Sequence, residues 1–341
     1  MKPDIRTVAQ RAGVSIGTVS NVLHGRVSVN PAIRTRVLKV IAELGYQPSR
    51  TAQGLRSKHT KTLGLIISDL TNPFFTRIAA AVEMTVTRAG YDLILATSSE
   101  DIQKERRAVE SLANRRVDGL IMAPAPGNHS YLRDVLAQGI PVVLTNRRLP
   151  RLQIPAVYSD HVAGAAVATE HLISHGHRRI GIIVGLRGLS ATADQLRGIR
   201  RALRARKAAN PTIVEVESGA TLEGGHKAAH DLVRGPSPVT AILSLSTMST
   251  LGALAAIRRM GIRIPGDLAF IGCSDHEWCE VTDPPLTMIQ QQATQIGLQA
   301  TQWLLDLLTG AAIPGRKAVL LPTTLNIRQS CGCPAKGTRS P

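Results

Sequence analysis

Residues Ile5 to Leu55 read IRTVAQRAGVSIGTVSNVLHGRVSVNPAIRTRVLKVIAELGYQPSRTAQGL, and the spacing of apolar residues in this stretch predicts three helices. A first short helix should end at Gly13, and a second should run from Ile16 to His24. Asn30-Pro31 offers a cap and a first turn for a third helix, which Gly45 ends. The second helix begins with short polar side chains, which suit insertion into the major groove of DNA. This pattern therefore predicts a helix-turn-helix headpiece.

The positive charge of the chain is concentrated in the same region. Residues 1–61 contain eleven basic and two acidic residues, so they carry +9 of the net charge of +17. Such asymmetry is expected when one module neutralises phosphates and the other does not. A solvated basic surface would give the same charge, but the helical pattern beneath it favours double-stranded DNA as the partner.

The length and composition of the chain bound its class. With 341 residues, 43% of them hydrophobic, two or three compact units are expected. No apolar run of about 18 residues occurs, and the N-terminal MKPDIRTVAQ lacks the hydrophobic region of a signal peptide. We therefore expect a cytoplasmic protein with no membrane partner. No nucleophile elbow, phosphate loop or metalloprotease motif is present, so neither an enzyme nor a cofactor is predicted.

Strand-like and helical patterns alternate from residue 62 onward. The first four apolar runs are LGLIISD (63–69), YDLILAT (91–97), VDGLIMAP (117–124) and IPVVLTN (140–146). A second set comprises RIGIIVG (179–185), VTAILSLS (239–246) and DLAFIGCS (267–274). Helices are expected at 78–88, 104–113, 132–138, 193–206, 249–260 and 294–308. This alternation predicts two similar, doubly wound parallel sheets.

A resemblance to a known family is carried by RTVAQRAGVSIGTVSNVLHG (6–25) and ELGYQPSRTAQGLRSKHTKTLGLIISDLTNPFF (43–75). These motifs are similar, in order and spacing, to the headpiece, hinge and first core strand of the LacI/GalR family of bacterial transcriptional repressors. The resemblance runs from about residue 4 to about residue 330. It implies an all-α helix-turn-helix headpiece and an α/β periplasmic-binding-protein-like core of two lobes. A periplasmic solute-binding protein is the rival class, but it would have a signal peptide and no headpiece.

The resemblance also implies a domain organisation and a mode of action. The headpiece would span 1–47, the hinge helix and linker 48–60, and the effector-binding and dimerisation core 61–330. Within the core, the N-lobe would comprise about 61–160 plus 292–318, and the C-lobe about 161–291 plus 319–330; a disordered tail would occupy 331–341. The chain lacks a C-terminal leucine-heptad helix, so we expect a homodimer that acts on a near-palindromic operator, most simply as a repressor.

The positions at which the family reads bases fall on Ile16, Gly17 and Asn21. Asn21 could pair with adenine and Ile16 could touch a thymine methyl, whereas Gly17 allows only backbone approach. A solvated Asn21 and a partly buried Ile16 are the alternatives. The remaining candidate DNA contacts are Thr18, Ser20 and His24 around the second helix and Arg50, Ala52, Leu55 and Arg56 in the hinge. Leu55 matches the family's leucine that wedges into the minor groove; a leucine packed on its own core is the alternative.

A small-molecule effector would bind at the carboxyl ends of the core strands. The candidate residues are Asn72, Phe74, Phe75, Asn146, Arg147, Gln195, Ser246, Ser274, Asp275 and Gln291. Helix capping by Asn72 and core packing of the two phenylalanines are the alternatives. Asn146, Gln195 and Ser274 stand where the family often has charged residues. Their loss argues against an ordinary neutral hexose or pentose, because charge-assisted hydrogen bonds to its hydroxyls are missing.

Two hypotheses about this pocket remain open. It binds a different metabolite, either a sugar derivative or an acidic compound that Arg147 and Arg187 would favour. Alternatively the pocket has decayed, and a protein partner or no ligand at all regulates the protein. In the first case the effector would change the angle between the lobes and act on DNA affinity through the hinge.

The histidine and cysteine patterns predict no metal site. His171, His175 and His177 have metal-like spacing, but the sequence around His177 is typical of a helix end that enters a strand. Cys331 and Cys333 offer two thiolates without nearby third and fourth ligands. We expect all four cysteines of the chain to be reduced thiols.

Overall fold

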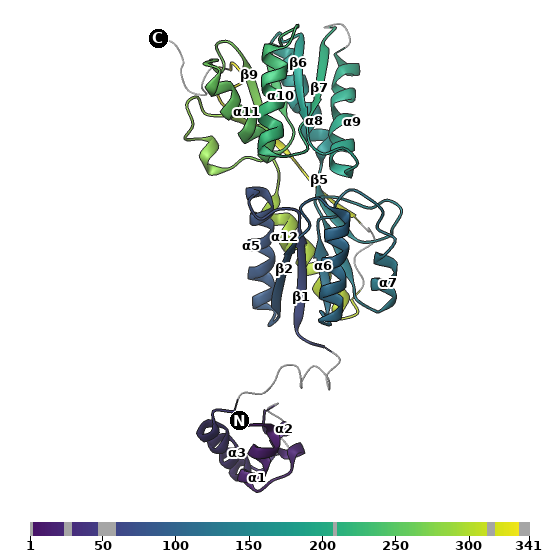
Figure 1. Ribbon diagram of the computed structural model, residues 1–341, viewed down its shortest axis with the longest axis vertical. Helices are drawn as coiled ribbons and strands as arrows, with labels where there is room; N and C mark the ends of the chain where they lie inside the picture. The colour runs from purple at the N-terminus through teal and green to yellow at the C-terminus, as the bar shows by residue number, and fades with distance from the viewer. Residues whose placement is uncertain (1–2, 24–28, 47–58, 207–209, 312–317, 334–341) are drawn as a thin grey trace. The chain divides into compact units, whose positions relative to one another are not determined.

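In a computed structural model of the chain, the described residues are 3–23, 29–46, 59–206, 210–311 and 318–333. They fall into two compact units, Met1–Thr60 and Lys61–Pro341. The first unit is helical and the second contains two parallel sheets covered by helices, so the predicted fold class is confirmed (Figure 1). The predicted hinge helix at 48–60 lies almost entirely outside the described residues.

The headpiece consists of α1 (Ile5–Ala12), α2 (Ile16–Leu23) and α3 (Pro31–Leu44), as the apolar spacing predicted. Gly13 ends α1 in the left-handed conformation, with φ of 62°, which allows the sharp turn into α2. Asn30 caps α3 by accepting a hydrogen bond from the backbone N–H of Ala32. Val8, Val19 and Val37, one from each helix, are fully buried in a common core. The three helices therefore pack around one shared core.

The N-lobe sheet has the strand order β11-β5-β4-β3-β1-β2, and all its pairings are parallel. Its strands are β1 (Thr62–Ile67), β2 (Asp92–Thr97), β3 (Gly119–Met122), β4 (Val142–Thr145), β5 (Ala156–Ser159) and β11 (Ala318–Leu321). Its helices are α5 (Pro73–Arg88), α6 (Ile102–Asn114), α7 (Leu132–Ala137) and α12 (Ala293–Leu308). Helices α5 and α12 pack on one face and α6 and α7 on the other. Both faces are buried, which is why the strands read as continuous apolar runs.

The C-lobe sheet repeats this architecture in the order β12-β10-β9-β8-β6-β7. Its strands are β6 (Arg179–Val184), β7 (Thr212–Glu217), β8 (Ala241–Ser244), β9 (Ala269–Cys273), β10 (Thr287–Gln290) and β12 (Thr324–Asn326). Only β12 among the described strands runs antiparallel to its neighbour, β10. Its helices are α8 (His161–Ser174), α9 (Ser190–Ala205), α10 (Leu222–Arg234) and α11 (Thr247–Arg259), with a short 3-10 turn at Glu277–Cys279. Helices α8 and α9 cover one face, and α10 and α11 cover the other (Figure 1).

The chain passes between the lobes three times, after β5, after β10 and after β11. Two of the expected boundaries need correction. Strand β11 pairs with β5, so the N-lobe includes residues up to Leu321 rather than ending at 318. The expected disordered tail does not begin at 331, because Cys331 is buried in the C-lobe core and the described chain continues to Cys333. The part of that tail beyond Cys333 lies outside the described residues.

None of the helices in the described ranges is long and apolar enough to cross a lipid bilayer.

Candidate functional site

Helix α2 exposes the start of the surface predicted to read DNA. Val19 and Val22 are buried, whereas Ile16 is 38% exposed and Gly17 is exposed. The Ser15 hydroxyl oxygen accepts a hydrogen bond from the backbone N–H of Thr18 at 3.1 Å, which caps the helix. The helix N-terminus is therefore available to a partner, as a recognition helix requires.

Of the other predicted DNA contacts, some lie on α2 and the rest lie outside the described residues. Thr18, Ser20 and Asn21 are partly buried on α2, and the Thr18 hydroxyl also lies 2.9 Å from that of Ser15. The predicted contacts outside the described residues are His24, Arg50, Ala52, Leu55 and Arg56. The base-reading assignments thus stay predictions.

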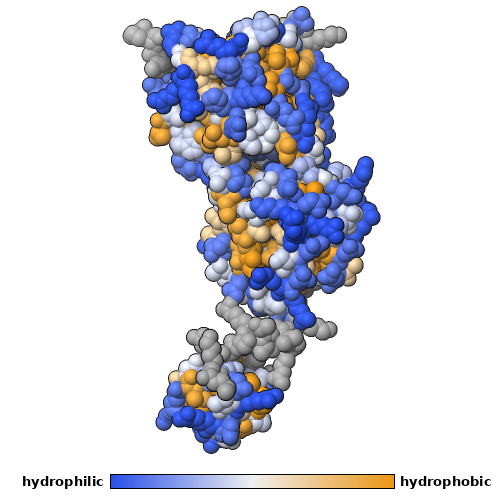
Figure 2. All heavy atoms as spheres, in the orientation of Figure 1, coloured by the Kyte–Doolittle hydropathy of each residue, from blue (hydrophilic) through white to orange (hydrophobic). Residues whose placement is uncertain are grey.

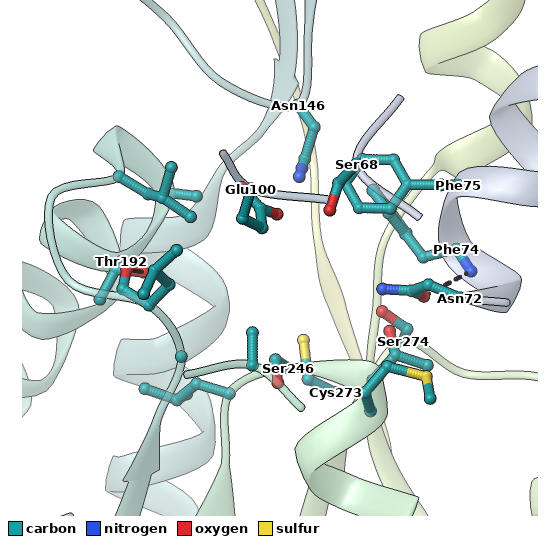
Figure 3. A pocket seen from close by; sticks show the side chains of 18 of the residues that line it. Ser68, Asn72, Phe74, Phe75, Glu100, Asn146, Thr192, Ser246, Cys273 and Ser274 are labelled. Carbon is teal, nitrogen blue, oxygen red and sulfur yellow. Dashed lines mark hydrogen bonds between the residues drawn. The ribbon is translucent and has the colours of Figure 1, made fainter. Parts of the chain in front are cut away.

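A cavity of about 400 Å³ lies between the two lobes of the core, at the carboxyl ends of strands from both sheets. This volume is within the range of about 300–1,000 Å³ that is usual for small-molecule sites. Nine of the ten predicted effector residues line it: Asn72, Phe74, Phe75, Asn146, Arg147, Gln195, Ser246, Ser274 and Gln291. In Figure 3 the labelled side chains surround this open space, with Phe75 and Asn72 on one side and Thr192 opposite. The cavity therefore lies where a ligand was expected, beyond the carboxyl ends of the strands.

Asn72 both caps a helix and faces the cavity. Its side-chain oxygen accepts a hydrogen bond from the backbone N–H of Phe74 at 3.0 Å, which leaves the amide nitrogen free to point into the open space (Figure 3). Phe74 and Phe75 are almost completely buried and pack edge to face, with ring centroids 5.4 Å apart. Capping and core packing therefore occur together with lining of the cavity.

Arg147 is neutralised by a carboxylate that the sequence reading missed. Its guanidinium donates two hydrogen bonds to Glu100, at 2.6 and 2.7 Å, and a third to the carbonyl of Pro124 at 2.8 Å. It also lies over the ring of Phe75, with 5.6 Å to the centroid. Because Glu100 cancels the charge, Arg147 is a poor attractant for an acidic ligand. Glu100 lies three residues after the predicted strand 91–97, and this position beyond a strand end could have identified it as a candidate cavity residue.

His161 joins the two lobes through a hydrogen-bonded chain. Ser274 donates to the side-chain oxygen of Gln291 at 2.9 Å, and the amide nitrogen of Gln291 lies 3.3 Å from His161 Nδ1. The other ring nitrogen of His161 lies 3.3 Å from the carbonyl oxygen of Asn146. Burial lowers the pKa of His161 to about 4, so the ring is neutral near pH 7. A neutral ring that accepts at Nδ1 and donates at Nε2 satisfies both contacts. Nothing in the local sequence singled out His161.

Asp275 does not line the cavity, so its assignment as an effector contact is wrong. Its two carboxylate oxygens accept hydrogen bonds from Arg328 at 2.8 and 2.9 Å, and Asn326 donates a further one at 2.6 Å. Successive side chains after a strand tend to point in opposite directions, and here Ser274 takes the cavity side. Arg187 also lies outside this cavity, where it pairs with Glu215.

The backbone around the cavity adopts unusual conformations. Eight non-glycine residues in the described ranges have positive φ, and five of them line the cavity: Ser99, Glu100, Asn146, Ala220 and Ser274. Such conformations cost about 1–3 kcal/mol each and persist where the surrounding structure imposes them, commonly at binding sites. Buried polar atoms without hydrogen-bond partners also indicate a binding site. Asn146 Oδ1 and Arg147 Nε have no hydrogen-bond partner within the described chain, although both residues are over 90% buried.

Comparison with known proteins agrees with both units. Residues 4–49 match the family described as bacterial regulatory proteins, lacI family, and residues 169–331 match a periplasmic binding protein-like domain. The ribose operon repressor of Haemophilus influenzae is 34% identical over 328 residues, which cover 96% of this chain and 98% of that protein. The regulator CelR of Thermobifida fusca is 32% identical over 336 residues, covering 96% of this chain and 98% of that protein.

Solved structures extend the likeness to the whole architecture. The Lac repressor dimer bound to operator and an anti-inducer matches with a TM-score of 0.84 and 28% identity, covering 97% of this chain and 99% of that one. A complex of CelR with cellobiose matches with a TM-score of 0.69 and 31% identity, covering 96% and 99%. The chain therefore belongs to the LacI family of bacterial regulatory proteins. It is a transcriptional repressor of that family and not an enzyme.

Proposed function

We propose that this repressor acts as a homodimer whose affinity for its operator is controlled by a neutral, hydroxyl-rich metabolite bound between the core lobes. The observation that carries the proposal is the cavity of about 400 Å³, which receives side chains from both lobes. A ligand that contacts both lobes has different affinity for different lobe angles, and this difference is what shifts a conformational equilibrium.

The chemistry of the lining selects the class of ligand. Its charged side chains already have partners, since Arg147 is paired with Glu100 and both carboxylate oxygens of Asp69 accept hydrogen bonds from Thr71; only Nε of Arg147 lacks one within the described chain. The groups that remain are mostly hydroxyls and amides, among them those of Asn72 and Asn146. Neutral donors and acceptors beside aromatic rings suit a sugar or a related polyol better than an organic acid. This reverses the preference drawn from the sequence, which took Arg147 as unpaired and argued against a neutral hexose or pentose. The names of relatives, a ribose operon repressor and a regulator solved with cellobiose, support the same class.

A thermal-shift screen of the full chain tests the ligand class. The panel comprises neutral sugars and nucleosides, sugar phosphates and organic acids. We expect only neutral compounds to raise the melting temperature; a ligand at 100 times its Kd adds about 2.7 kcal/mol of stability. A response to organic acids alone would contradict the neutral ligand. If no class of compound changed the melting temperature, the alternative of a decayed pocket that binds no metabolite would be favoured.

A matched pair of variants locates the binding. Asn72→Asp keeps the oxygen that caps α5 but replaces the amide donor that faces the cavity. Asn128→Asp makes the same change at a turn outside this cavity, where Asn128 accepts a hydrogen bond from the backbone N–H of Ser130 at 3.0 Å. We expect the first variant to lose affinity for the ligand and the second to retain it. Equal loss in both would move the binding site elsewhere.

Operator selection from random DNA, followed by binding measurements, tests the DNA assignments. We expect Asn21→Ala to relax base preference at one position of each half-site, at a cost of about 1–3 kcal/mol. Leu55→Ala should weaken binding to the selected operator far more than binding to random DNA. With the ligand added, operator affinity should change by about 5- to 150-fold. An unchanged selection profile for Asn21→Ala would remove this residue from base readout.

A surface of the N-lobe supports the homodimer. Leu70, just before α5, and Met84, on α5, are 50% and 37% exposed, and β2 forms the edge of the sheet beside them. Figure 2 shows apolar surface on this side of the lobe. A second copy of the chain would cover these residues. We expect Met84→Glu to shift the mass in sedimentation equilibrium towards the monomer; an unchanged mass would place the contact elsewhere.

A further inference from the structure

Two histidines and two cysteines lie close together at the end of α8, although His171 and Cys331 are 160 positions apart in the chain. His171 lies in the last turn of α8, and His175 follows as the residue that caps its end. Residues four apart on a helix lie on the same face, and these two rings are 4.3 Å apart between centroids. Both imidazoles therefore face the same place on the C-lobe.

The C-terminal segment is held against this place by hydrogen bonds. Ser330 anchors it, since its hydroxyl donates to the carbonyl of Phe270 at 2.7 Å and accepts from the backbone N–H of Thr287 at 2.8 Å. The anchor buries Cys331 against the C-lobe core. Gly332 then adopts φ of 86°, a conformation that suits glycine, and the turn brings the sulfur of Cys333 within 3.2 Å of that of Cys331.

The donor atoms of three of these side chains lie close together, and Cys331 lies beside two of them. His171 Nε2 lies 3.3 Å from each of the two sulfurs, and His175 Nε2 lies 3.0 Å from Cys333 Sγ. The donor atoms of His171, His175 and Cys333 all lie within 4.8 Å of one another. This convergence overturns the expectation that the cysteine pair has no third and fourth ligand nearby.

We propose that His171, His175, Cys331 and Cys333, the His–Cys cluster, bind one Zn²⁺ ion. Imidazole nitrogens and thiolate sulfurs are the donors that Zn²⁺ takes in tetrahedral sites, with bonds of about 2.0–2.1 Å to nitrogen and about 2.3 Å to sulfur. These bond lengths place neighbouring donors about 3.3–3.8 Å apart in a tetrahedron. The four donor–donor distances given above, 3.0–3.3 Å, are slightly shorter than these values, whereas Cys331 does not lie within 4.8 Å of all three other donors. Binding of the ion therefore requires Cys331 and His175 to move towards each other and the other donors to move slightly outward.

Surrounding hydrogen bonds orient the donors as a metal site requires. His175 Nδ1 lies 2.9 Å from the carbonyl oxygen of His171, so this nitrogen carries the proton and Nε2 presents its lone pair to the cluster. The hydroxyl of Thr287, which is fully buried, donates to Cys331 Sγ at 3.1 Å. Donors of this kind stabilise thiolate ligands and fix their direction.

The composition of the cluster assigns it a structural role. Four protein ligands complete a tetrahedral site and leave no open position for a substrate. The soft thiolates select Zn²⁺ over Mg²⁺ or Ca²⁺. The ion would fasten the C-terminal segment to α8 and so close a loop of about 160 residues, which contains α12 and β11 of the N-lobe as well as most of the C-lobe. This inference is independent of the effector proposed above.

Titration of the full chain with Co²⁺ tests the site, with a phosphine reductant present to keep the thiols reduced. We expect one Co²⁺ per chain, with the thiolate-to-metal charge-transfer band and the intense visible absorption of a tetrahedral complex, both abolished by stoichiometric Zn²⁺. Alkylation followed by mass spectrometry requires no variant. Modification of Cys333 should be lost in the Zn²⁺-loaded protein and proceed in the metal-free protein.

Three variants assign the donors. His175→Gln and Cys333→Ser alter residues at the surface, and His230→Gln changes an exposed histidine on α10 as a control. We expect the first two to weaken Zn²⁺ affinity by more than about 100-fold, because outer-shell partners alone are worth about 10–100-fold. The control should retain the affinity of the wild type.

Several results would overturn the proposal. They are the absence of the charge-transfer band, equal affinity in Cys333→Ser and the control, or alkylation of Cys333 that Zn²⁺ does not affect. A Cys331–Cys333 disulfide that persists in the presence of reductant and prevents uptake of the metal would also overturn it.

Discussion

Replacing Glu100 by glutamine removes the charge that balances Arg147 in the effector cavity. The two hydrogen bonds of 2.6 and 2.7 Å place the charge centres about 4 Å apart, which corresponds to about 4 kcal/mol at an effective dielectric constant of about 20. The side chains are only 6% and 18% exposed, so solvent screens them weakly. Glutamine retains one hydrogen-bond acceptor. We therefore expect Glu100→Gln to lower the free energy of unfolding of the core by about 2–3 kcal/mol.

Urea unfolding followed by tryptophan fluorescence measures this loss. Trp278 and Trp303 both belong to the core unit, so their signal reports on the core rather than on the headpiece. The matched control is Glu277→Gln, whose carboxylate pairs with Arg77 but is 90% exposed. We expect the control to leave the transition midpoint nearly unchanged.

The second half of the prediction concerns ligand charge. In Glu100→Gln the unpaired Arg147 should attract an anion, so acidic metabolites that do not bind the wild type should raise the melting temperature of the variant. Equal midpoint shifts in Glu100→Gln and Glu277→Gln would refute the assignment of a buried, charge-balancing pair. No gain in anion binding by the variant would refute the view that Glu100 excludes acidic ligands.

Three further predictions follow from contacts in the C-lobe and the cavity. Gly198→Ala would place a Cβ atom 2.2 Å from the carbonyl oxygen of Val162, so α8 and α9 must separate; we expect a loss of about 1–3 kcal/mol by thermal melting, and an unchanged melting temperature would contradict it. Since burial holds the pKa of His161 at about 4 rather than 6.5, the unfolded chain takes up its proton first as the pH falls. Stability should therefore decrease between pH 6.5 and 4, by about 2 kcal/mol from pH 7 to pH 5, and His161→Gln should lack this component; identical pH slopes would reject it. Asp275→Asn should destabilise the core through loss of its pair with Arg328 yet leave effector affinity unchanged. If the variant bound the effector more weakly under conditions in which it is fully folded, Asp275 would be an effector contact after all.

Patterns that depend on neighbouring residues were readable from the sequence. Helical periodicity and the caps at Gly13 and Asn30 predicted the three helices of the headpiece, because capping and amphipathicity act within a few residues. Continuous apolar runs predicted the central strands, since strands buried on both faces need no polar side chains. Strands β5, β7, β10, β11 and β12, most of them short or at the edges of the sheets, gave weaker patterns and were not predicted.

The tertiary structure alone decided which distant side chains meet. The pairing of Arg147 with Glu100 and the convergence of His171 on Cys333 join residues 47 and 162 positions apart, and no local periodicity encodes such contacts. The sequence determined that the protein carries a DNA-binding headpiece and a two-lobed core with a cavity at the strand ends. Only the tertiary structure within each lobe determined that Glu100 balances Arg147 and that the cysteines face two histidines, because burial and charge compensation depend on residues far apart in the chain.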